Sequence, residues 1–586
     1  MLEVWEMYSQ TRIFIILLLL LSMTLSRMLL HELPLWSWDC IDNRCIPVNT
    51  TYSEKLQSLI TCNMLCTSLP FWPHPTGKVE ISTTAVAVCA DQFSLQILSY
   101  PSITIRDYVN EAFILFQSDL LAMNKNICAL TVQGRVIVQI AINESGSIDP
   151  RILLDTDESY KLRLKTDNDT ILVNIFSNTF SGSRHALETL LQMIWLDSYT
   201  NNLFILQEAS VDDAPRFRYR GLMLDTTHSY FPTEQILRTI DAMAASKLNT
   251  FHWHTTNSKA FSLQLDNIPR LDKLEFYGPQ AMYTEDDVRT VTKHARLRGI
   301  RVILEVDLLA HIGSSWFWKQ NTSDDETLSC IEIQNLVARC SKRSCGLINQ
   351  RNLNLYNTIQ RLYAEIINVT GVEDIFHLGG ADISKYCWAE NIDQTELFNI
   401  WTELILNTLQ RLESDYGQLP LFILWSKHLP ERFKMDLKVY IHKFAFQSLN
   451  IGWTQNNFYG LCTIISNENI WDLNSGLGNW DEEYGGGPYN SWQRIYEYRP
   501  WAGRSVGCVE GGEVTVWSST LNADGLNARI WPRASAFSER LWSDRTEDAT
   551  RSVLIRLDFH RKRLMNRGIN STPVWSMWCT YNKFYC

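Results

Sequence analysis

One short stretch places an acidic side chain directly after a buried strand. An apolar run begins at Ile375 and ends in Gly379 and Gly380, and Ala381 and Asp382 follow. This pattern predicts a strand that stops where the backbone passes close to another group. In a barrel of alternating strands and helices, side chains at the carboxyl end of a strand point into the mouth, where catalysis takes place. Asp382 is therefore a candidate for proton transfer.

The elements around this stretch alternate between strand and helix. After the turn-rich residues 212–215, strands are predicted at 219–225, 250–254, 301–307, 375–379, 421–425, 437–444, 462–466 and 514–517. Helices are predicted at 233–247, 286–298, 356–369, 395–412, 534–542 and 547–566. Alternation implies a parallel sheet, and eight such units close as a (β/α)8 TIM barrel. We predict this barrel, with a C-terminal helix and disulfide tail, over residues 213–586.

The residues before the barrel have a different pattern. Residues 79–88 and 132–142 are rich in β-formers, and residues 183–195 have the apolar spacing of a helix. This part contains no catalytic constellation. We predict a smaller α+β domain over residues 31–212 with a supporting role.

Composition and charge restrict the class of protein. The chain has 586 residues, 45% of them apolar and 20% charged, which is ordinary for a globular protein of two or three domains. A net charge of −11 without a long single-sign run argues against a nucleic-acid partner. The 21 tryptophans serve packing or sugar stacking, depending on their positions.

The N-terminus predicts entry into the secretory pathway. Arg12 precedes an apolar run over residues 13–21, which is shorter than the roughly 20 residues of a membrane-spanning helix. Residues 1–30 therefore fit a signal peptide, with an uncleaved signal anchor as the alternative. A secreted, lysosomal or membrane-anchored protein is expected.

Cysteines and sugar-acceptor sequences favour the same route. The 14 cysteines form clusters of unequal spacing, typical of disulfides in an oxidising compartment, and their pairings stay open. The clusters are Cys40, Cys45, Cys62 and Cys66, then Cys330, Cys340 and Cys345, then Cys579 and Cys586. Asn-x-Ser/Thr acceptors occur at Asn49, Asn143, Asn168, Asn321, Asn368 and Asn570.

Several motifs follow the pattern of one family. They are residues 220–225 (Arg-Gly-Leu-Met-Leu-Asp), 252–254 (His-Trp-His), 296–302, 376–380 (Phe-His-Leu-Gly-Gly), 511–513 (Gly-Gly-Glu), 531–534 and 539–542. Over nearly its whole length the chain resembles the β-N-acetylhexosaminidases, glycoside hydrolase family 20. Trp36, Trp38 and the spaced cysteines resemble the insect-type members. The resemblance implies that Cys387 bridges to the loop of residues 330–345 and Cys579 to Cys586.

The resemblance also implies a damaged catalytic centre. Members of this family use the sugar's own acetamido oxygen as the nucleophile, with an Asp-Glu pair where this chain has Ala381 and Asp382. The first acid orients the amide and the second protonates the leaving oxygen, so Ala381 leaves the amide without a partner. Asp382 is one methylene shorter than Glu if it serves as the general acid. If it takes the first acid's role instead, no general acid is left.

Other positions around the implied pocket differ from the family in the same direction. The family has an Asp at Asn257, a Gln and a Ser at Lys259 and Ala260, and a Glu at Ser519. A Tyr that contacts the acetamido oxygen corresponds to Asp472, and an Asp that binds outer hydroxyls corresponds to Asn474. The family's Gln-x-Trp on the sixth strand corresponds to residues 442–444.

Part of a sugar cradle is expected to persist. Arg220 corresponds to the arginine that binds the terminal sugar, although pairing with a carboxylate is an equal alternative. Asp307 and His311 lie where the family supports its acid, His311 more as a framework residue than a base. Trp425, Phe444 and Trp517 are expected to wall the acetamido pocket. His252 and His254 lack the further ligands of a metal site, so no metal or cofactor is expected.

Two functions follow from these observations. The first is an impaired or inactive hexosaminidase-like protein that binds a glycan weakly or serves as an interaction partner. The alternative is a functioning exo-glycosidase that removes terminal β-linked N-acetylglucosamine or N-acetylgalactosamine from glycans or chitooligosaccharides. A homodimer and an N-terminal membrane anchor stay open.

Overall fold

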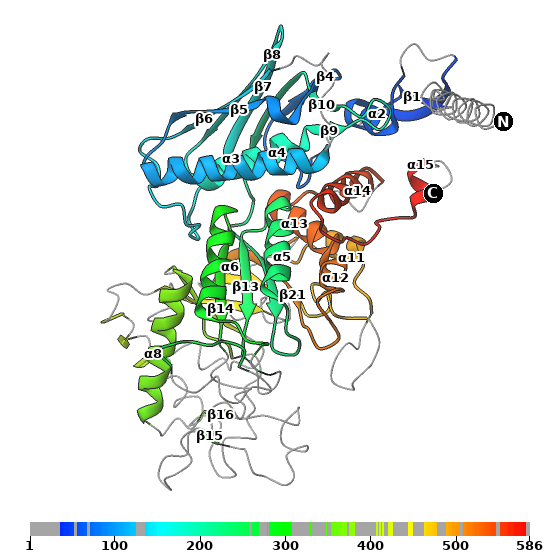
Figure 1. The fold of residues 1–586 in the computed structure, drawn as a ribbon. Coiled ribbons are helices and arrows are strands. Elements are labelled where there is room, and N and C mark those ends of the chain that lie inside the picture. The colour runs from blue at the N-terminus through cyan, green and yellow to red at the C-terminus, as the bar shows by residue number, and fades with distance from the viewer. Residues whose placement is uncertain are drawn as a thin grey trace, which may run out of the picture. The chain divides into compact units, whose positions relative to one another are not determined.

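A computed structural model gives the fold of the chain (Figure 1). It describes residues 36–51, 56–66, 71–124, 135–256, 261–268, 278, 280–306, 328–329, 347–348, 353–371, 374–380, 403, 406–407, 410–411, 413–414, 420–425, 444–448, 462–476, 488–502, 508–546 and 551–581. The chain divides into two compact units, residues 1–68 with 195–202, and residues 69–194 with 203–586. In the described part, no helix is long and apolar enough to cross a membrane. The predicted signal segment, residues 1–30, lies outside it.

The first unit is a small disulfide-bonded fold. Strands β1 (Trp36–Ile41) and β2 (Arg44–Asn49) form an antiparallel hairpin beside helix α2 (Leu59–Cys66). The hairpin turns through two residues with positive φ, Asp42 and Asn43, which is the conformation that tight hairpins favour. Disulfides join Cys40 to Cys66 and Cys45 to Cys62, and so hold the helix on the hairpin. The expectation of disulfides in this cluster is confirmed.

The second unit begins with an α+β domain. Its six-stranded sheet has the order β3-β11-β7-β8-β6-β5. The strands are β3 (Val79–Ile81), β5 (Phe93–Ser99), β6 (Arg135–Ile142), β7 (Tyr160–Asp167), β8 (Thr170–Ser177) and β11 (Glu208–Asp213). Helices α3 (Ile103–Met123) and α4 (Phe180–Gln192) pack on one face, and α4 is almost wholly buried (Figure 1). Strands β4 (Ala85–Val88) and β10 (Leu203–Leu206) pair separately.

Eight parallel strands then close into a barrel, as predicted. In order they are β12 (Tyr219–Asp225), β13 (Thr250–His254), β14 (Arg301–Glu305), β17 (Ile375–His377), β18 (Leu421–Trp425), β19 (Phe444–Ser448), β20 (Cys462–Ile465) and β21 (Val509–Val516). The barrel closes where β21 pairs with β12. Gly511 makes this closure possible, because a Cβ at this position would fall on the carbonyl oxygen of Tyr219.

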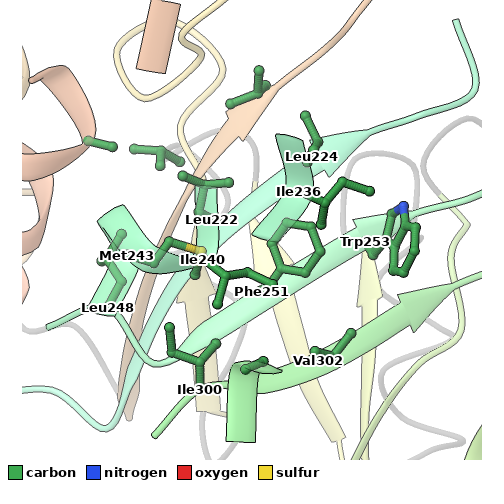
Figure 2. Close-up of a cluster of buried hydrophobic side chains, with 14 of the residues drawn as sticks. Leu222, Leu224, Ile236, Ile240, Met243, Leu248, Phe251, Trp253, Ile300 and Val302 are labelled. Carbon is green, nitrogen blue, oxygen red and sulfur yellow. The ribbon is translucent and has the colours of Figure 1, made fainter. Parts of the chain in front are cut away.

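Helices cover the outside of the barrel. Those that pack on barrel strands include α5 (Thr233–Ala245), α6 (Glu285–Leu297), α8 (Leu353–Thr370) and α13 (Arg533–Ser543). The chain also forms α11 (Trp492–Glu497), α12 (Leu526–Ile530), α14 (Arg551–Asn566) and α15 (Met577–Tyr581). Apolar side chains from consecutive strands, Leu222, Phe251 and Val302, meet Ile240 and Met243 of α5 in the outer core (Figure 2). This packing fixes the strands, and therefore the side chains at their carboxyl ends.

The sixth barrel strand differs from its prediction. It was expected at residues 437–444, and β19 begins at Phe444 and runs to Ser448. Its register follows from pairing, since Phe444 lies opposite Phe422 and Gln447 opposite Trp425. Short apolar runs stand on both sides of Lys443, at residues 439–441 and 444–446, so the pattern alone did not locate the strand.

Candidate active site at the carboxyl end of the barrel

A group of polar side chains fills the barrel interior below its mouth. We call His252, Glu305, His377, Gln447 and Glu513 the central cluster; all five are buried. Each comes from a different strand of the barrel. Parallel alignment brings them together although up to 261 residues separate them in sequence. Sequence analysis named His252, His377 and Glu513 only as parts of separate motifs and missed the cluster.

His252 links the two acids of the central cluster. Its Nδ1 lies 2.9 Å from Glu513 Oε1 and its Nε2 lies 2.8 Å from Glu305 Oε2. Burial would lower the pKa of His252, but Glu513 and Glu305 outweigh that effect and raise it to about 10. His252 is therefore a cation at neutral pH; its Nδ1 donates to Glu513, and its Nε2 faces Glu305 at ion-pair distance.

His377 has the opposite charge state. Burial lowers the pKa of His377 to about 4, even though Glu305 is near. The backbone N–H of Gly379 donates to its Nδ1 at 3.0 Å, and its Nε2–H donates to Gln447 Oε1 at 3.0 Å. These partners assign the proton of the neutral ring to Nε2. The histidine of the Phe-His-Leu-Gly-Gly motif thus fixes the backbone where β17 ends.

Glu305 is the acid on which most of these contacts converge. Besides His252, it receives the indole N–H of Trp425 at 2.7 Å and lies 3.1 Å from His254 Nδ1. Burial would raise the pKa of Glu305, but His377, His254 and His252 outweigh burial and hold it well below its ordinary value. The carboxylate is charged, accepts from Trp425 and is surrounded by histidines, which suits a framework role better than proton transfer.

The central cluster also contains the described atoms that come nearest to a metal site outside the disulfides. His252, Glu305 and His377 could each direct one ligand atom to a shared point. The 2.8 Å contact between His252 and Glu305 is the length of a charge-assisted hydrogen bond, and the high pKa of His252 keeps its proton in place. A metal would have to displace that proton, so these residues fit an ion-pair cluster better.

A second polar group lies at the mouth, at the end of β12. The carboxylate of Asp225 accepts bonds from the N–H and hydroxyl of Thr227 and of Ser518, and lies 2.6 Å from His228 Nδ1. Burial would raise the pKa of Asp225, but His228 and His254 outweigh it and hold it well below its ordinary value. Sequence analysis missed His228. Its position three residues after a strand-ending acid was the available signal.

The predicted tryptophan walls have different surroundings. Trp517 follows β21, is half-buried, and its ring meets that of His254 edge-on at 5.4 Å. Trp425 ends β18 but is only 1% exposed, and its N–H is bound to Glu305. Trp517 therefore faces the mouth, whereas Trp425 belongs mainly to the packing above the central cluster.

The loop after β20 brings together three residues that differ from the implied family pattern. Asp472 accepts bonds from the N–H of Asn474 at 2.9 Å and from the hydroxyl of Ser475 at 2.7 Å. Burial raises the pKa of Asp472 above its ordinary value despite these bonds. The amide of Asn474 lies 3.4 Å from the hydroxyl of Ser519 and accepts from Thr520. These side chains satisfy one another within the loop.

Comparison with known proteins assigns the chain to a family. The model of the glycosyl hydrolase family 20 catalytic domain matches residues 217–545, and one described as beta-acetyl hexosaminidase like matches residues 71–193. "Probable beta-hexosaminidase fdl" of Drosophila melanogaster is 31% identical, covering 94% of this chain and 91% of its own length. The chain belongs to glycosyl hydrolase family 20. A chitooligosaccharidolytic beta-N-acetylglucosaminidase of Bombyx mori is similarly close, at 30% identity over 95% of this chain and 96% of its own.

Solved family 20 structures share the fold. The Flavobacterium johnsoniae chitobiase superposes with a TM-score of 0.65 at 22% identity, over 86% of this chain and 73% of its own. The Vibrio harveyi exo beta-N-acetylglucosaminidase with N-acetylglucosamine gives 0.66 at 21% identity, over 92% and 84%. The predicted family and the barrel with its preceding α+β domain are confirmed.

Arg220 is not at the mouth of this family 20 barrel, contrary to the predicted sugar contact. It is the second residue of β12, about 17 Å along the strand from Asp225. Its guanidinium is fully buried and forks onto Glu158, with nitrogen–oxygen distances of 2.9 and 2.5 Å. It also donates to the carbonyl oxygens of Phe217 and Lys247. Pairing with a carboxylate, the alternative weighed for this residue, is what the structure shows.

Phe444 has the same correction. As the first residue of β19, it lies at the amino end of a parallel strand, away from the mouth. The residue of this strand that contacts the interior is Gln447, whose amide donates to Glu513 at 2.5 Å. The backbone of Phe444 is therefore at the end of the strand opposite the mouth, where the predicted acetamido pocket would lie.

Several predicted family 20 residues lie outside the described part of the chain. They are Asn257, Asp307, His311, Ala381, Asp382, Cys387, Cys586 and Asn321. Gly380, which immediately precedes Ala381 in the sequence, is buried and has a φ of 91°. Cys579 takes part in a disulfide. Of the other sugar acceptors, Asn49 is half-buried, and Asn143, Asn168, Asn368 and Asn570 are exposed.

Proposed function

We propose that this family 20 protein is a hexosaminidase-like protein with impaired or absent hydrolysis, which retains a glycan-facing barrel mouth. The observation that carries the proposal is the pair Ala381-Asp382, where the family motif has Asp-Glu. It stands directly after the strand β17 and the two glycines that end it. The described part of the barrel does not supply the missing group.

The expected loss follows from the chemistry of the pair. An alanine offers no charge and no acceptor to the acetamido nitrogen, and the loss of one preorganised partner costs about 10²–10³ in rate. A general acid shortened by one methylene is displaced by roughly 1 Å, which costs about 10² more. The two effects together bring turnover of a hexosaminide close to background.

The carboxylates that line the described barrel do not offer a replacement. Asp225 is bound by Thr227, His228 and Ser518, and the acids of the central cluster are held by histidine, glutamine, tyrosine and tryptophan donors. Asp472 is occupied by its own loop. A Vibrio harveyi exo beta-N-acetylglucosaminidase of the same fold is described as inactive after one Asp→Ala change. That supports the cost of losing a single acid in this fold.

A chromogenic β-N-acetylglucosaminide assay on the purified protein tests the proposal. We expect turnover at least about 10³-fold below that of the Bombyx mori relative under the same conditions. Turnover within tenfold of that relative would overturn the proposal. The alternative, an exo-glycosidase acting on terminal β-linked N-acetylhexosamine, would then be established if Asp382→Asn abolished the activity. Relatives of about 30% identity with chitooligosaccharidolytic names keep this alternative in view.

A variant with the Asp-Glu pair of the family restored provides the matched control. Ala381→Asp combined with Asp382→Glu is expected to raise activity without reaching the level of the relative, because Asn257, Asp472, Asn474 and Ser519 still differ from the family pattern. Calorimetry with chitobiose then measures whether the mouth around Trp517 binds sugar. Binding supports a glycan partner. The absence of a binding signal favours an interaction role with another protein.

We also propose that the protein is a secretory glycoprotein, either secreted, lysosomal or anchored by its N-terminal segment. The disulfides of the first unit and the bond between Cys462 and Cys508 support an oxidising compartment. Expression in a secreting cell line tests this, through appearance in the medium and a loss of mass on treatment with a glycosidase that removes N-linked chains. Retention in the cytosol without sugar would contradict it.

A further inference from the structure

The sheet of the α+β domain has one face without helices, and its side chains form ordered rows. Strand pairing places Gln96, Gln139 and Asn174 next to one another, and the first two are hydrogen-bonded at 2.8 Å. The neighbouring row contains Ala141 opposite Phe176, and Phe176 opposite Lys161. We call this surface the open face. It presents planar amides beside an aromatic ring, which are groups that can contact the hydroxyls and the C–H face of a sugar.

An open groove lies at the end of the open face. Its volume is about 660 Å³, within the range of ligand sites. Its lining includes Ser99, Ala141, Lys161, Phe176, Asn178 and Asp212. The ring of Phe176 is 47% exposed here, although it comes from a central strand of the sheet. A single exposed phenylalanine is ordinary, but one that lines a groove can be covered by a ligand with an apolar face.

The sugar acceptor Asn143 belongs to the lining of the same groove. It follows β6 directly, and its backbone N–H donates to the carbonyl of Ser177, next to Phe176. The hydroxyl and N–H of Ser145 both donate to Asn143 Oδ1, at 2.8 and 3.1 Å. The carbonyl of the acceptor amide is therefore held, and Nδ2, the atom that carries a sugar, lies 3.3 Å from Asn178 Oδ1 at the groove.

The acceptor site is held firmly. Asn178 donates to Asp157 at 2.7 Å, which fixes the side chain that faces Asn143. Gly146 lies so close to the backbone of Asn178 that a Cβ would fall on its carbonyl oxygen. Asn168, by contrast, forms the tight turn between β7 and β8, at the opposite end of β8 from Phe176. Asn168 is thus an acceptor on the same sheet that does not line this groove.

We propose that an N-linked glycan on Asn143 folds back into the groove, so that its first N-acetylglucosamine residues cover Phe176. This inference rests on the proposed secretory route. Asn143 Nδ2 attacks the anomeric carbon of an oligosaccharide linked to a lipid diphosphate, the donor that secretory cells supply. The new N–C bond replaces the C–O bond to the diphosphate, which leaves with the electron pair, and the amide proton passes to solvent. The sugar's C–H face then packs on the ring, and its polar groups meet Lys161, Asn178 and Asp212.

Enzymatic release of glycans from the native, secreted full chain tests the proposal. The chain is treated with an endoglycosidase that cuts between the first two sugars, and release at Asn143 and Asn168 is followed separately by peptide mass spectrometry. We expect release at Asn143 to be slow, and Phe176→Ala to make it about fivefold faster, the factor that corresponds to ~1 kcal/mol. Release at Asn168 should not change. Ile114→Ala, which removes an exposed side chain of α3 outside the groove, is the matched control and should leave both rates unchanged.

A thermal measurement provides a second readout. Phe176→Ala should lower the unfolding temperature of the glycosylated chain by about 2–4 °C. The same change should have a clearly smaller effect in a Ser145→Ala background, which has no sugar on Asn143.

Three outcomes would overturn the proposal. The first is that Asn143 carries no sugar in a chain whose Asn168 is modified. The second is that sugar is released from Asn143 and Asn168 at the same rate, both in the unchanged protein and in Phe176→Ala. The third is that Phe176→Ala lowers the unfolding temperature equally with and without Ser145→Ala. Absence of sugar at every acceptor would overturn the secretory route as well. Free chitobiose that stabilises the Ser145→Ala chain only when Phe176 is present would point instead to a glycan of another molecule.

Discussion

Removal of the charge on Glu158 tests whether Arg220 is a structural residue. Glu158 precedes β7 in the α+β domain, and its two oxygens receive the guanidinium of Arg220 in the barrel. It also accepts from Asn249 at 3.0 Å and contacts His185 at 2.9 Å. Glu158→Gln keeps the shape of the side chain and removes the charge, so that Arg220 becomes a buried cation without a carboxylate.

The magnitude can be worked in two ways. Breaking a buried pair by neutralising one partner costs about 3–5 kcal/mol. Burial would raise the pKa of Glu158, but Arg220 and His185 outweigh it and lower it from 4.5 to about 2. At about 1.4 kcal/mol for each pH unit, that change corresponds to about 3 kcal/mol at neutral pH. We therefore expect Glu158→Gln to lower the free energy of unfolding by about 3 kcal/mol.

The assay is urea unfolding followed by tryptophan fluorescence, with Arg218→Gln as the matched control. Arg218 is exposed, so its change should be within about 0.5 kcal/mol of the unchanged protein. Because the pKa of Glu158 is lowered by folding, its contribution is full above pH 4.5 and is lost as the pH falls towards 2. The difference in unfolding free energy between Glu158→Gln and the unchanged protein should therefore narrow as the pH falls from 4.5 towards 2. A Glu158→Gln protein as stable as the original, together with an Arg220→Lys protein that loses chitobiose binding, would refute a structural role.

Three further predictions concern the barrel. The free energy of unfolding should fall as the pH rises from 6.5 to about 10, because the folded protein holds the His252 proton over this range and the unfolded chain does not. Urea unfolding measures this slope, which should be absent in His252→Gln. Trp425→Phe removes the indole donor to Glu305 and should cost about 1.5–3 kcal/mol in the same assay, and a neutral result would mean that Glu305 finds another donor. Gly511→Ala places a Cβ on the carbonyl of Tyr219 and should cost about 3 kcal/mol or more, measured as a lower unfolding temperature, unless the seam between β12 and β21 can shift.

The barrel was predictable from sequence because its strands are apolar runs bounded by turns. Residues 219–225, 250–254 and 421–425 were predicted with the bounds that the structure gives. The sixth strand was not, since apolar runs stand at both 439–441 and 444–446 and only pairing with β18 fixes its register.

The candidate site was less predictable. The central cluster depends on contacts between strands far apart in sequence, which no local pattern encodes. Arg220 shows a different failure, because a motif suggested its role while its place near the start of β12 already argued against it. In a parallel barrel, the second residue of a strand lies at the end opposite the mouth.

Because the central cluster is buried, the residues that stabilise the barrel are separate from those expected to carry out catalysis. His252, Glu305 and Glu513 form ion pairs with one another inside the barrel, so we expect its stability not to depend on the two residues that follow Gly380. The loops at the mouth of the barrel can then be replaced together. This scaffold is a candidate recipient for loops transplanted from an active relative, and its stability should survive the graft whether or not the graft turns over sugar.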